Sequence, residues 1–193
     1  MLLVGITGAT SSGKTTLLKN LAETLGDDIS TLSFDEYFIG SDLYKVEDIT
    51  NFEDPALYDF SKFIRDLKSL KSGKSLTIRS NSRESAESGV KEKVIDSRPI
   101  VVVEGWLIFL RSEARELFDK KLYVDLSDEE VLERRHSRTK GSKHWDSVEY
   151  IQNKILPGIR AYVEPQRAYA DTVLDGSKPE KELVGQVIDL LEK

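Results

Sequence analysis

Apolar positions along the chain follow two spacings. Short apolar runs predict buried strands, whereas apolar positions three or four residues apart predict amphipathic helices. The runs predict strands at 2–7, 29–34, 99–105, 120–126 and 171–176. The spaced positions predict helices at 14–25, 55–73, 128–138, 146–168 and 178–193. Strands that alternate with helices indicate an α/β fold of three layers, with a mainly parallel sheet and helices on both faces.

Residues with special backbone chemistry set the ends of these elements. Gly26 is a suitable C-terminal stop for the first helix, and Pro55 a suitable start for the second. Ser127 followed by Glu130 three residues later is the pattern of an N-terminal capping box. Pro157 predicts a kink or break within 146–168.

Composition narrows the class of protein. The chain has 193 residues, enough for one domain over 1–193, and a net charge of -6 that disfavours general nucleic-acid binding. Its apolar runs fall short of the roughly 18 residues that span a bilayer, so we expect no membrane partner. The absence of cysteine fits a reducing, cytoplasmic setting. Self-association as a homo-oligomer stays open. Polar composition predicts mobile loops at 80–93 and 139–147.

The segment 5–16, GITGATSSGKTT, lies between the first predicted strand and helix and contains the spacing G-x-x-x-x-G-K-T. This is the P-loop pattern, in which backbone N–H groups and a helix N-terminus hold phosphate oxygens. Lys14 would reach the β- and γ-phosphates of ATP, and the Thr15 hydroxyl would ligate Mg²⁺. The alternative is a glycine-rich turn with an exposed lysine. The predicted nucleotide-binding residues are Gly8, Ala9, Thr10, Ser11, Ser12, Gly13, Lys14, Thr15 and Thr16.

Other motifs favour a small-molecule kinase among P-loop proteins. The guanine-reading N-K-x-D pattern is absent, because Asn153-Lys154 is followed by Ile155 and Leu156. Asp35 follows the second predicted strand, at the sheet edge where ligands bind in open α/β folds. A carboxylate there can accept a proton from an acceptor hydroxyl, although a turn or cap would use the same residue type.

Most of the chain resembles the uridine kinase family, whose relatives include phosphoribulokinase, nicotinamide riboside kinase and bacterial pantothenate kinase. The resemblance is carried by GITGATSSGKTT, SFDEYF, NFEDPALYDF, DLKSLKSGKS, VVVEGWLIF, KKLYVDLSDEEVLERRHSRT and YVEPQRAYADTVLDG. The first motif is generic, whereas NFEDPALYDF and the arginine-bearing segment followed by EPQRAYAD are more specific. The implied fold is a P-loop NTPase-type domain with a helical lid.

The resemblance implies roles for residues on the acceptor side. Asp35 would be the catalytic carboxylate and Glu53 would bind ribose hydroxyls, although an acidic turn before a helix is the alternative for Glu53. Tyr37 and Phe38 would line the acceptor pocket, or would belong to the core. Glu104 ends an apolar strand, and a place near Mg²⁺ and its waters would relieve the cost of burying its charge.

The resemblance also implies a lid at about 127–147 whose arginines close over the phosphates. Arg135 and Arg138 are the candidates, because guanidinium groups stabilise charge on the transferring phosphoryl group. Arg134 is expected to be a surface residue. A solvated basic face that pairs with nearby glutamates is the alternative.

The acceptor side, an insertion at about 36–95, departs from the family within 76–84. Asn81 stands where the family has histidine, and no tyrosine precedes it, whereas Ser82 and Arg83 are kept. Arg79 and Arg83 could contact an anionic acceptor or be exposed loop charges. ATP-dependent transfer to the 5′-hydroxyl of uridine or cytidine is therefore the first expectation. Another acceptor (nicotinamide riboside, pantothenate or a sugar phosphate) and an inactive nucleotide-binding regulator are the alternatives.

Overall fold

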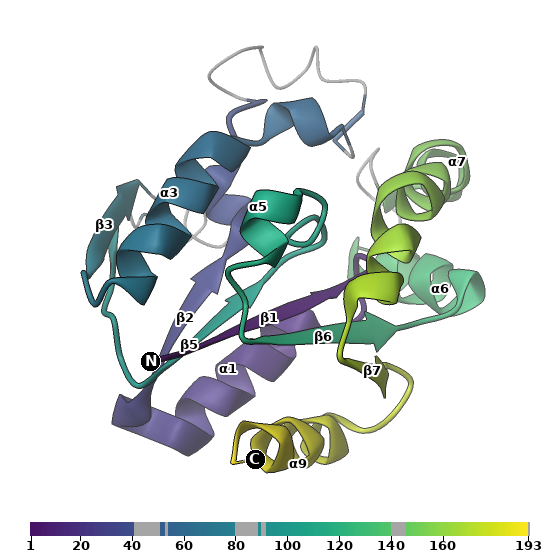
Figure 1. Cartoon of the computed structure of the whole chain (residues 1–193). Coiled ribbons are helices and arrows are strands. Elements are labelled where there is room, and N and C mark those ends of the chain that lie inside the picture. Colours follow the sequence, from purple (N-terminus) through teal and green to yellow (C-terminus); the bar gives the residue numbers. More distant parts are fainter. Residues whose placement is uncertain (41–50, 53, 80–88, 90–91, 140–145, 193) are drawn as a thin grey trace.

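A computed structural model describes residues 1–40, 51–52, 54–79, 89, 92–139 and 146–192 of the chain. Within these ranges the main sheet has five strands in the order β2-β5-β1-β6-β7, and every neighbouring pair is parallel (Figure 1). The strands are β1 Leu2–Gly8, β2 Ile29–Ser33, β5 Ile100–Glu104, β6 Lys120–Asp125 and β7 Thr172–Asp175. The predicted α/β fold is confirmed.

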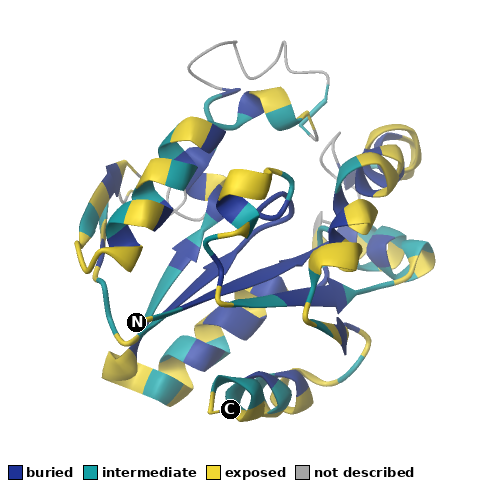
Figure 2. Ribbon diagram, viewed as in Figure 1, coloured by how far each residue is buried: buried dark blue, intermediate teal, exposed yellow. Residues whose placement is uncertain are grey.

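Helices cover both faces of this sheet because apolar side chains of the central strands alternate between them. Leu3 and Val101 face the layer that contains α3 and α5, whereas Val4 and Val102 face α1 and α9. Figure 2 shows buried sheet strands between helices with exposed outer faces. The helices named here are α1 Lys14–Leu25, α9 Glu180–Leu191, α3 Phe60–Lys71 and α5 Ser112–Arg115.

Short helical turns lie on either side of β2 and before α3. The turns are η1 Gly26–Asp28, η2 Phe34–Tyr37 and η4 Pro55–Leu57. The helix predicted at 55–73 is divided, since Pro55 starts a 3-10 turn and the Asp59 side chain caps α3 by accepting from Lys62 N at 2.8 Å. Gly26 follows α1 as predicted, with φ 54°.

The described parts of the segment between β6 and β7 are mostly helical. Ser127 and Glu130 form the predicted capping box, because the Ser127 N–H donates to Glu130 Oε2 (3.1 Å) and Glu130 N donates to Ser127 Oγ (3.3 Å). The helical conformation continues through Pro157, so the chain does not break there, and π-type turns lie on either side of this residue. The elements are α6 Asp128–Thr139, α7 Val148–Tyr150, η6 Ile151–Ile155, α8 Leu156–Gly158, η7 Ile159–Val163 and η8 Glu164–Tyr169.

Two predicted loops need correction. An antiparallel hairpin of β3 Leu76–Arg79 and β4 Glu92–Ile95 lies beside α3, so the end of the loop predicted at 80–93 is strand. The loop predicted at 139–147 contains Asp146, which is fully buried, and Ser147, which caps α7. No helix in the described ranges is long and apolar enough to cross a bilayer.

Candidate active site

The phosphate loop connects β1 to α1 through residues with unusual backbone angles. Gly8, Ser11 and Gly13 have φ values of 150°, 60° and 92°. A Cβ on Gly8 would lie 2.4 Å from the carbonyl oxygen of Val124, so only glycine fits there. Gly13 is the N-cap of α1, and the loop therefore ends at the positive end of a helix dipole.

The Lys14 ammonium lies inside this loop. It donates to the carbonyl oxygens of Gly8 (2.9 Å) and Ala9 (2.7 Å) and to Ser12 Oγ (3.2 Å), and the residue is 7% exposed. The alternative of an exposed lysine on a simple turn is therefore wrong. A buried cation inside a loop that leads into a helix N-terminus is suited to bind phosphate oxygens.

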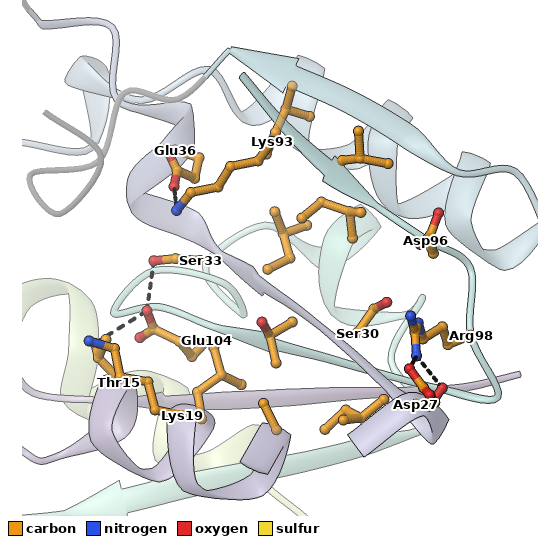
Figure 3. A pocket seen from close by; sticks show the side chains of 18 of the residues that line it. Thr15, Lys19, Asp27, Ser30, Ser33, Glu36, Lys93, Asp96, Arg98 and Glu104 are labelled. Carbon is orange, nitrogen blue, oxygen red and sulfur yellow. Dashed lines mark hydrogen bonds and ion pairs between the residues drawn. The ribbon is translucent and has the colours of Figure 1, made fainter. Parts of the chain in front are cut away.

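The ends of β2 and β5 bring three polar side chains to the phosphate loop. Glu104 is 3% exposed, and its Oε1 accepts hydrogen bonds from Ser33 Oγ (2.6 Å) and Thr15 Oγ1 (3.4 Å) (Figure 3). Ser33 Oγ also accepts from Asp35 N at 3.3 Å, which caps the η2 turn. Asp35 is exposed beside this cluster, at the sheet edge where it was predicted.

The chemistry of Thr15 and Glu104 fits a hard divalent cation. Both side chains supply oxygen atoms that can bind a cation. The two groups that hydrogen-bond to Glu104 are neutral hydroxyls, which do not compensate its negative charge. Within the described residues no three His, Cys, Asp or Glu side chains gather to form a metal site. Mg²⁺ is commonly held by one or two protein oxygens together with substrate phosphates, and the side chains of Thr15 and Glu104 supply such oxygens.

A buried carboxylate contacts the two arginines that were predicted to belong to a lid. Asp146 is fully buried, and its Oδ1 lies 3.2 Å from both Arg135 Nε and Arg138 Nη2. Arg135 Nη1 also donates to Thr10 Oγ1 of the phosphate loop at 2.7 Å, so one candidate arginine contacts that loop directly. Arg138 is directed to the same carboxylate. Asp146 was not among the predicted site residues, because a single aspartate in a polar segment carries no distinguishing spacing.

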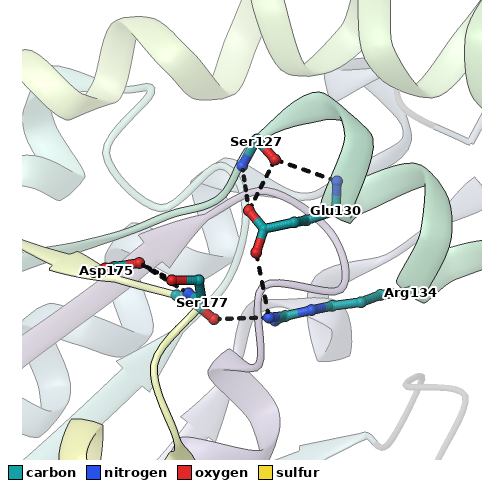
Figure 4. Close-up of polar contacts among 6 residues, drawn as sticks. Ser127, Glu130, Arg134, Asp175 and Ser177 are labelled. Atoms are coloured by element: carbon teal, nitrogen blue, oxygen red, sulfur yellow. Dashed lines mark hydrogen bonds and ion pairs between the residues drawn. The ribbon is translucent and has the colours of Figure 1, made fainter.

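Arg134 lies on another side of α6 and bridges to the C-terminal part of the fold. Its Nη2 donates to the Gly176 carbonyl oxygen at 3.1 Å and lies 3.8 Å from Glu130 Oε1 (Figure 4). A cavity of about 400 Å³ lies next to it, against the outer side of the phosphate loop. Arg134 is therefore a partly exposed residue, with 38% of its side chain exposed, that also contacts the loop after β7. The cavity is lined by Ser11, Ser12, Gly13, Thr16, Leu17, Arg134, Gly176, Lys178, Pro179, Glu180 and Leu183.

The two aromatic residues after Asp35 have different environments. Tyr37 is 1% exposed, and its hydroxyl donates to Asp66 Oδ2 at 3.0 Å. Burial and the Asp66 charge raise the pKa of Tyr37, which stays neutral as a core residue. Its interpretation as a pocket wall gives way to the core alternative. Phe38 is partly exposed, with ring centroids 6.3 Å from Phe52 and 5.5 Å from Tyr58.

The other predicted acceptor residues are only partly described. Arg79 is exposed at the end of β3, in register with Glu92. Glu53 and Arg83 lie outside the described residues. The structure thus brings together the phosphate loop, Asp35, Glu104 and Arg135, and it places Arg79 on the separate hairpin.

Gln166 lies in the EPQRAYAD motif and connects η8 to the segment after β5. Gln166 was not among the predicted site residues, although this motif is one of those that carry the resemblance. Its side chain is buried, accepts from Phe109 N (2.8 Å) and donates to the Trp106 and Tyr162 carbonyl oxygens (2.7 Å each). These bonds join η8 to the segment that follows β5, and they satisfy backbone groups that burial would otherwise leave unpaired.

A parallel sheet of this order, with a phosphate loop after its central strand and an arginine-bearing helix over that loop, defines the class of P-loop kinases. The chain belongs to the phosphoribulokinase / uridine kinase family, whose model matches residues 3–181. A uridine kinase from Chlamydia pneumoniae is 31% identical over 190 residues, which cover 92% of this chain and 82% of that protein. The chain is accordingly an ATP-dependent small-molecule kinase.

Solved structures agree on the fold. A protein described as a possible uridine kinase from Bacillus stearothermophilus has a TM-score of 0.65 at 22% identity, and the match covers 90% of this chain and 88% of that one. Phosphoribulokinase from Rhodobacter spheroides has a TM-score of 0.64 at 16% identity, with 93% and 73% covered. At these identities the likeness shows the common architecture.

Proposed function

We propose that the chain transfers the γ-phosphoryl group of ATP to the 5′-hydroxyl of uridine or cytidine. The observation that carries the proposal is the position of Asp35, exposed beside the Ser33–Glu104–Thr15 cluster and the phosphate loop. The uridine kinase from Chlamydia pneumoniae supports a nucleoside as the acceptor. The absence of cysteine from the chain supports a cytoplasmic setting.

In the proposed reaction, the Gly8–Thr16 loop holds the triphosphate, and Asp35 orients the acceptor hydroxyl and accepts its proton. The acceptor oxygen forms a bond to the γ-phosphorus while the bond from that phosphorus to the β,γ-bridging oxygen breaks, and ADP leaves. Lys14 inside the loop and Arg135 next to it neutralise charge on the transferring group. Mg²⁺, held by Thr15 and through Glu104, would supply further charge neutralisation at the phosphates.

The lid and acceptor side complete the proposal. Residues 127–147 would form the lid, in which Arg138 joins Arg135 through Asp146. The adenine base would occupy the cavity beside Arg134, because this cavity adjoins the phosphate loop on the side away from Asp35. Residues 36–95 would form the acceptor side, with Phe38, Glu53, Arg79 and Arg83 as candidate contacts in addition to Asp35.

A panel of acceptors tests the function. ADP formation from Mg·ATP is measured with uridine, cytidine, nicotinamide riboside, pantothenate and ribulose 5-phosphate. The proposal expects turnover to rise with uridine or cytidine. Turnover with only one of the other alcohols would identify that alcohol as the acceptor. The differences from the family pattern within 76–84 would then explain the change of acceptor. Nucleotide binding with no stimulated turnover would indicate a regulatory protein instead.

A further inference from the structure

An ion pair joins the turn that carries Asp35 to the β3–β4 hairpin. Glu36 follows Asp35 in η2, its side chain is 2% exposed, and its Oε1 lies 2.6 Å from Lys93 Nζ. Lys93 belongs to β4 and is 34% exposed at its side chain (Figure 3). A carboxylate this buried is stable only when its charge is compensated. The turn and the hairpin are therefore linked by a contact that the fold has to keep.

The pair lies at one end of a cavity between the hairpin and the sheet. This cavity, of about 560 Å³, runs between α1, the edge strand β2 and β4. A second ion pair lies at its far end, between Arg98 Nη1 and Asp27 Oδ1 at 2.8 Å. Ile78 and Ile95 anchor the hairpin in the core at 2% and 6% exposure. The Glu36–Lys93 pair is thus a charged link between β4 and η2, in addition to the apolar contacts of Ile78 and Ile95.

Two other contacts hold η2 in place around Asp35. On the preceding side, Ser33 Oγ accepts from Asp35 N and donates to Glu104. On the following side, the Tyr37 hydroxyl donates to Asp66 of α3. The Glu36–Lys93 pair is a third contact of η2 and attaches it to the hairpin. Asp35 is consequently the exposed residue of a turn fixed to the phosphate site, to α3 and to the hairpin.

We infer that Glu36 and Lys93 are positioning residues that set the acceptor half of the site. Arg79 pairs in register with Glu92, the neighbour of Lys93, so the same link sets the distance between Asp35 and the hairpin end that carries Arg79. The pair governs use of the acceptor and leaves ATP binding to the phosphate loop. This inference rests on the proposed function for the identity of the acceptor. The contacts between η2 and the hairpin are the same whichever acceptor binds.

Steady-state kinetics with uridine and Mg·ATP test the inference in a Lys93→Met variant. We expect kcat/KM for uridine to fall about ten- to a hundredfold, since small misplacements of reacting groups have effects of that size. The KM for ATP stays within about twofold, and Lys93→Arg restores most of the loss, because the charge is kept. The double variant Glu36→Gln/Lys93→Met removes both charges, so it keeps the test valid where the single variant unfolds.

Lys71→Met is the matched control. Lys71 is 32% exposed at its side chain and pairs with Asp119 at 2.8 Å, away from the site. The Lys71→Met variant should lose a similar ion pair, and its kcat/KM for uridine should equal that of the parent. Equal falls in both lysine variants would overturn the inference, as would a rise in the KM for ATP that matches the fall for uridine.

Amide hydrogen exchange supplies a readout that needs no acceptor. Loss of the pair should speed exchange in η2 and β4 in Lys93→Met and in the double variant, but not in Lys71→Met. Unchanged exchange in these two elements would overturn the positioning role by itself. A parent protein that turns over none of the acceptors would refute the proposed function, and the exchange result would still decide whether the pair positions the hairpin.

Discussion

At the scale of single residues, Gly8 and Gly13 of the phosphate loop face different constraints. Both have positive φ, which costs an L-residue about 1–2 kcal/mol. A Cβ at Gly8 would also meet the Val124 carbonyl oxygen at 2.4 Å, whereas a Cβ at Gly13 meets nothing within 4 Å. Gly8 is therefore required by both backbone angle and packing, and Gly13 by backbone angle alone.

Alanine at these two positions should have unequal effects. We predict that Gly13→Ala lowers the free energy of unfolding by about 1–2 kcal/mol, and that Gly8→Ala lowers it by about 3 kcal/mol or more because overpacking adds to the backbone strain. Urea unfolding of the two variants and the parent measures this. Equal losses would contradict the packing argument.

Glu104 is the residue whose charge should matter more than its shape. Glu104→Gln keeps an oxygen that can accept from Ser33 but removes the negative charge next to Thr15. We predict that the Mg²⁺ concentration needed for half-maximal binding of Mg·ADP rises about tenfold or more, as measured by calorimetric titration. Glu130→Gln, in the exposed capping box, is the control. An unchanged Mg²⁺ requirement in Glu104→Gln would remove this residue from the metal site.

At the scale of elements, the strands of the sheet and α1 could be predicted because their patterns are local. The apolar run of β1 and the spaced leucines of α1 each specify an element without reference to the rest of the chain. Ser127 and Glu130 likewise form a capping box because both partners lie within one turn. The phosphate loop, Asp35 and Glu104 follow strand ends, so they could be placed as soon as the strands were recognised.

Contacts between distant segments could not be predicted in this way. The hairpin was not predicted because β3 and β4 have only four residues each. Apolar and polar residues alternate weakly in them, and Val94 is exposed. Tyr37 was ambiguous because its partner Asp66 lies 29 residues away. Asp146 and the Glu36–Lys93 pair depend on packing between elements, which no spacing within the sequence reveals.

The link between α6 and the segment before α7 should depend on Asp146. Removing this carboxylate leaves Arg135, whose side chain is 9% exposed, without the charge it contacts. We predict that Asp146→Ala lowers the free energy of unfolding by about 3 kcal/mol, the scale for breaking a buried pair, as measured by urea unfolding. Asp128→Ala, at an exposed pair with Arg160, should cost less than about 1 kcal/mol. Similar losses in both would show that burial of Asp146 does not matter.

At the scale of the whole molecule, nucleotide binding and folding should be coupled. The phosphate loop exists only when β1 lies between β5 and β6 and α1 packs beneath them, so the ligand binds the folded state alone. A ligand at a hundred times its dissociation constant then adds about 2.7 kcal/mol of stability.

This coupling should require Lys14. We predict that Mg·ATP raises the melting temperature of the parent and of Lys71→Met, and that it raises that of Lys14→Met much less, because Lys14 is the cation inside the loop. Thermal unfolding with and without Mg·ATP measures the shift. An equal shift in Lys14→Met would show that the nucleotide binds elsewhere.

The most direct test of the account as a whole is acceptor-stimulated ADP formation in Asp35→Asn, measured together with ATP affinity. The exposed carboxylate at the end of β2 is assigned to the acceptor, and the phosphate loop to the nucleotide. We predict a dissociation constant for ATP within about threefold of the parent value and a turnover with uridine about 10²- to 10⁴-fold lower, the usual contribution of a general base. A variant that turns over uridine at the rate of the parent would contradict it.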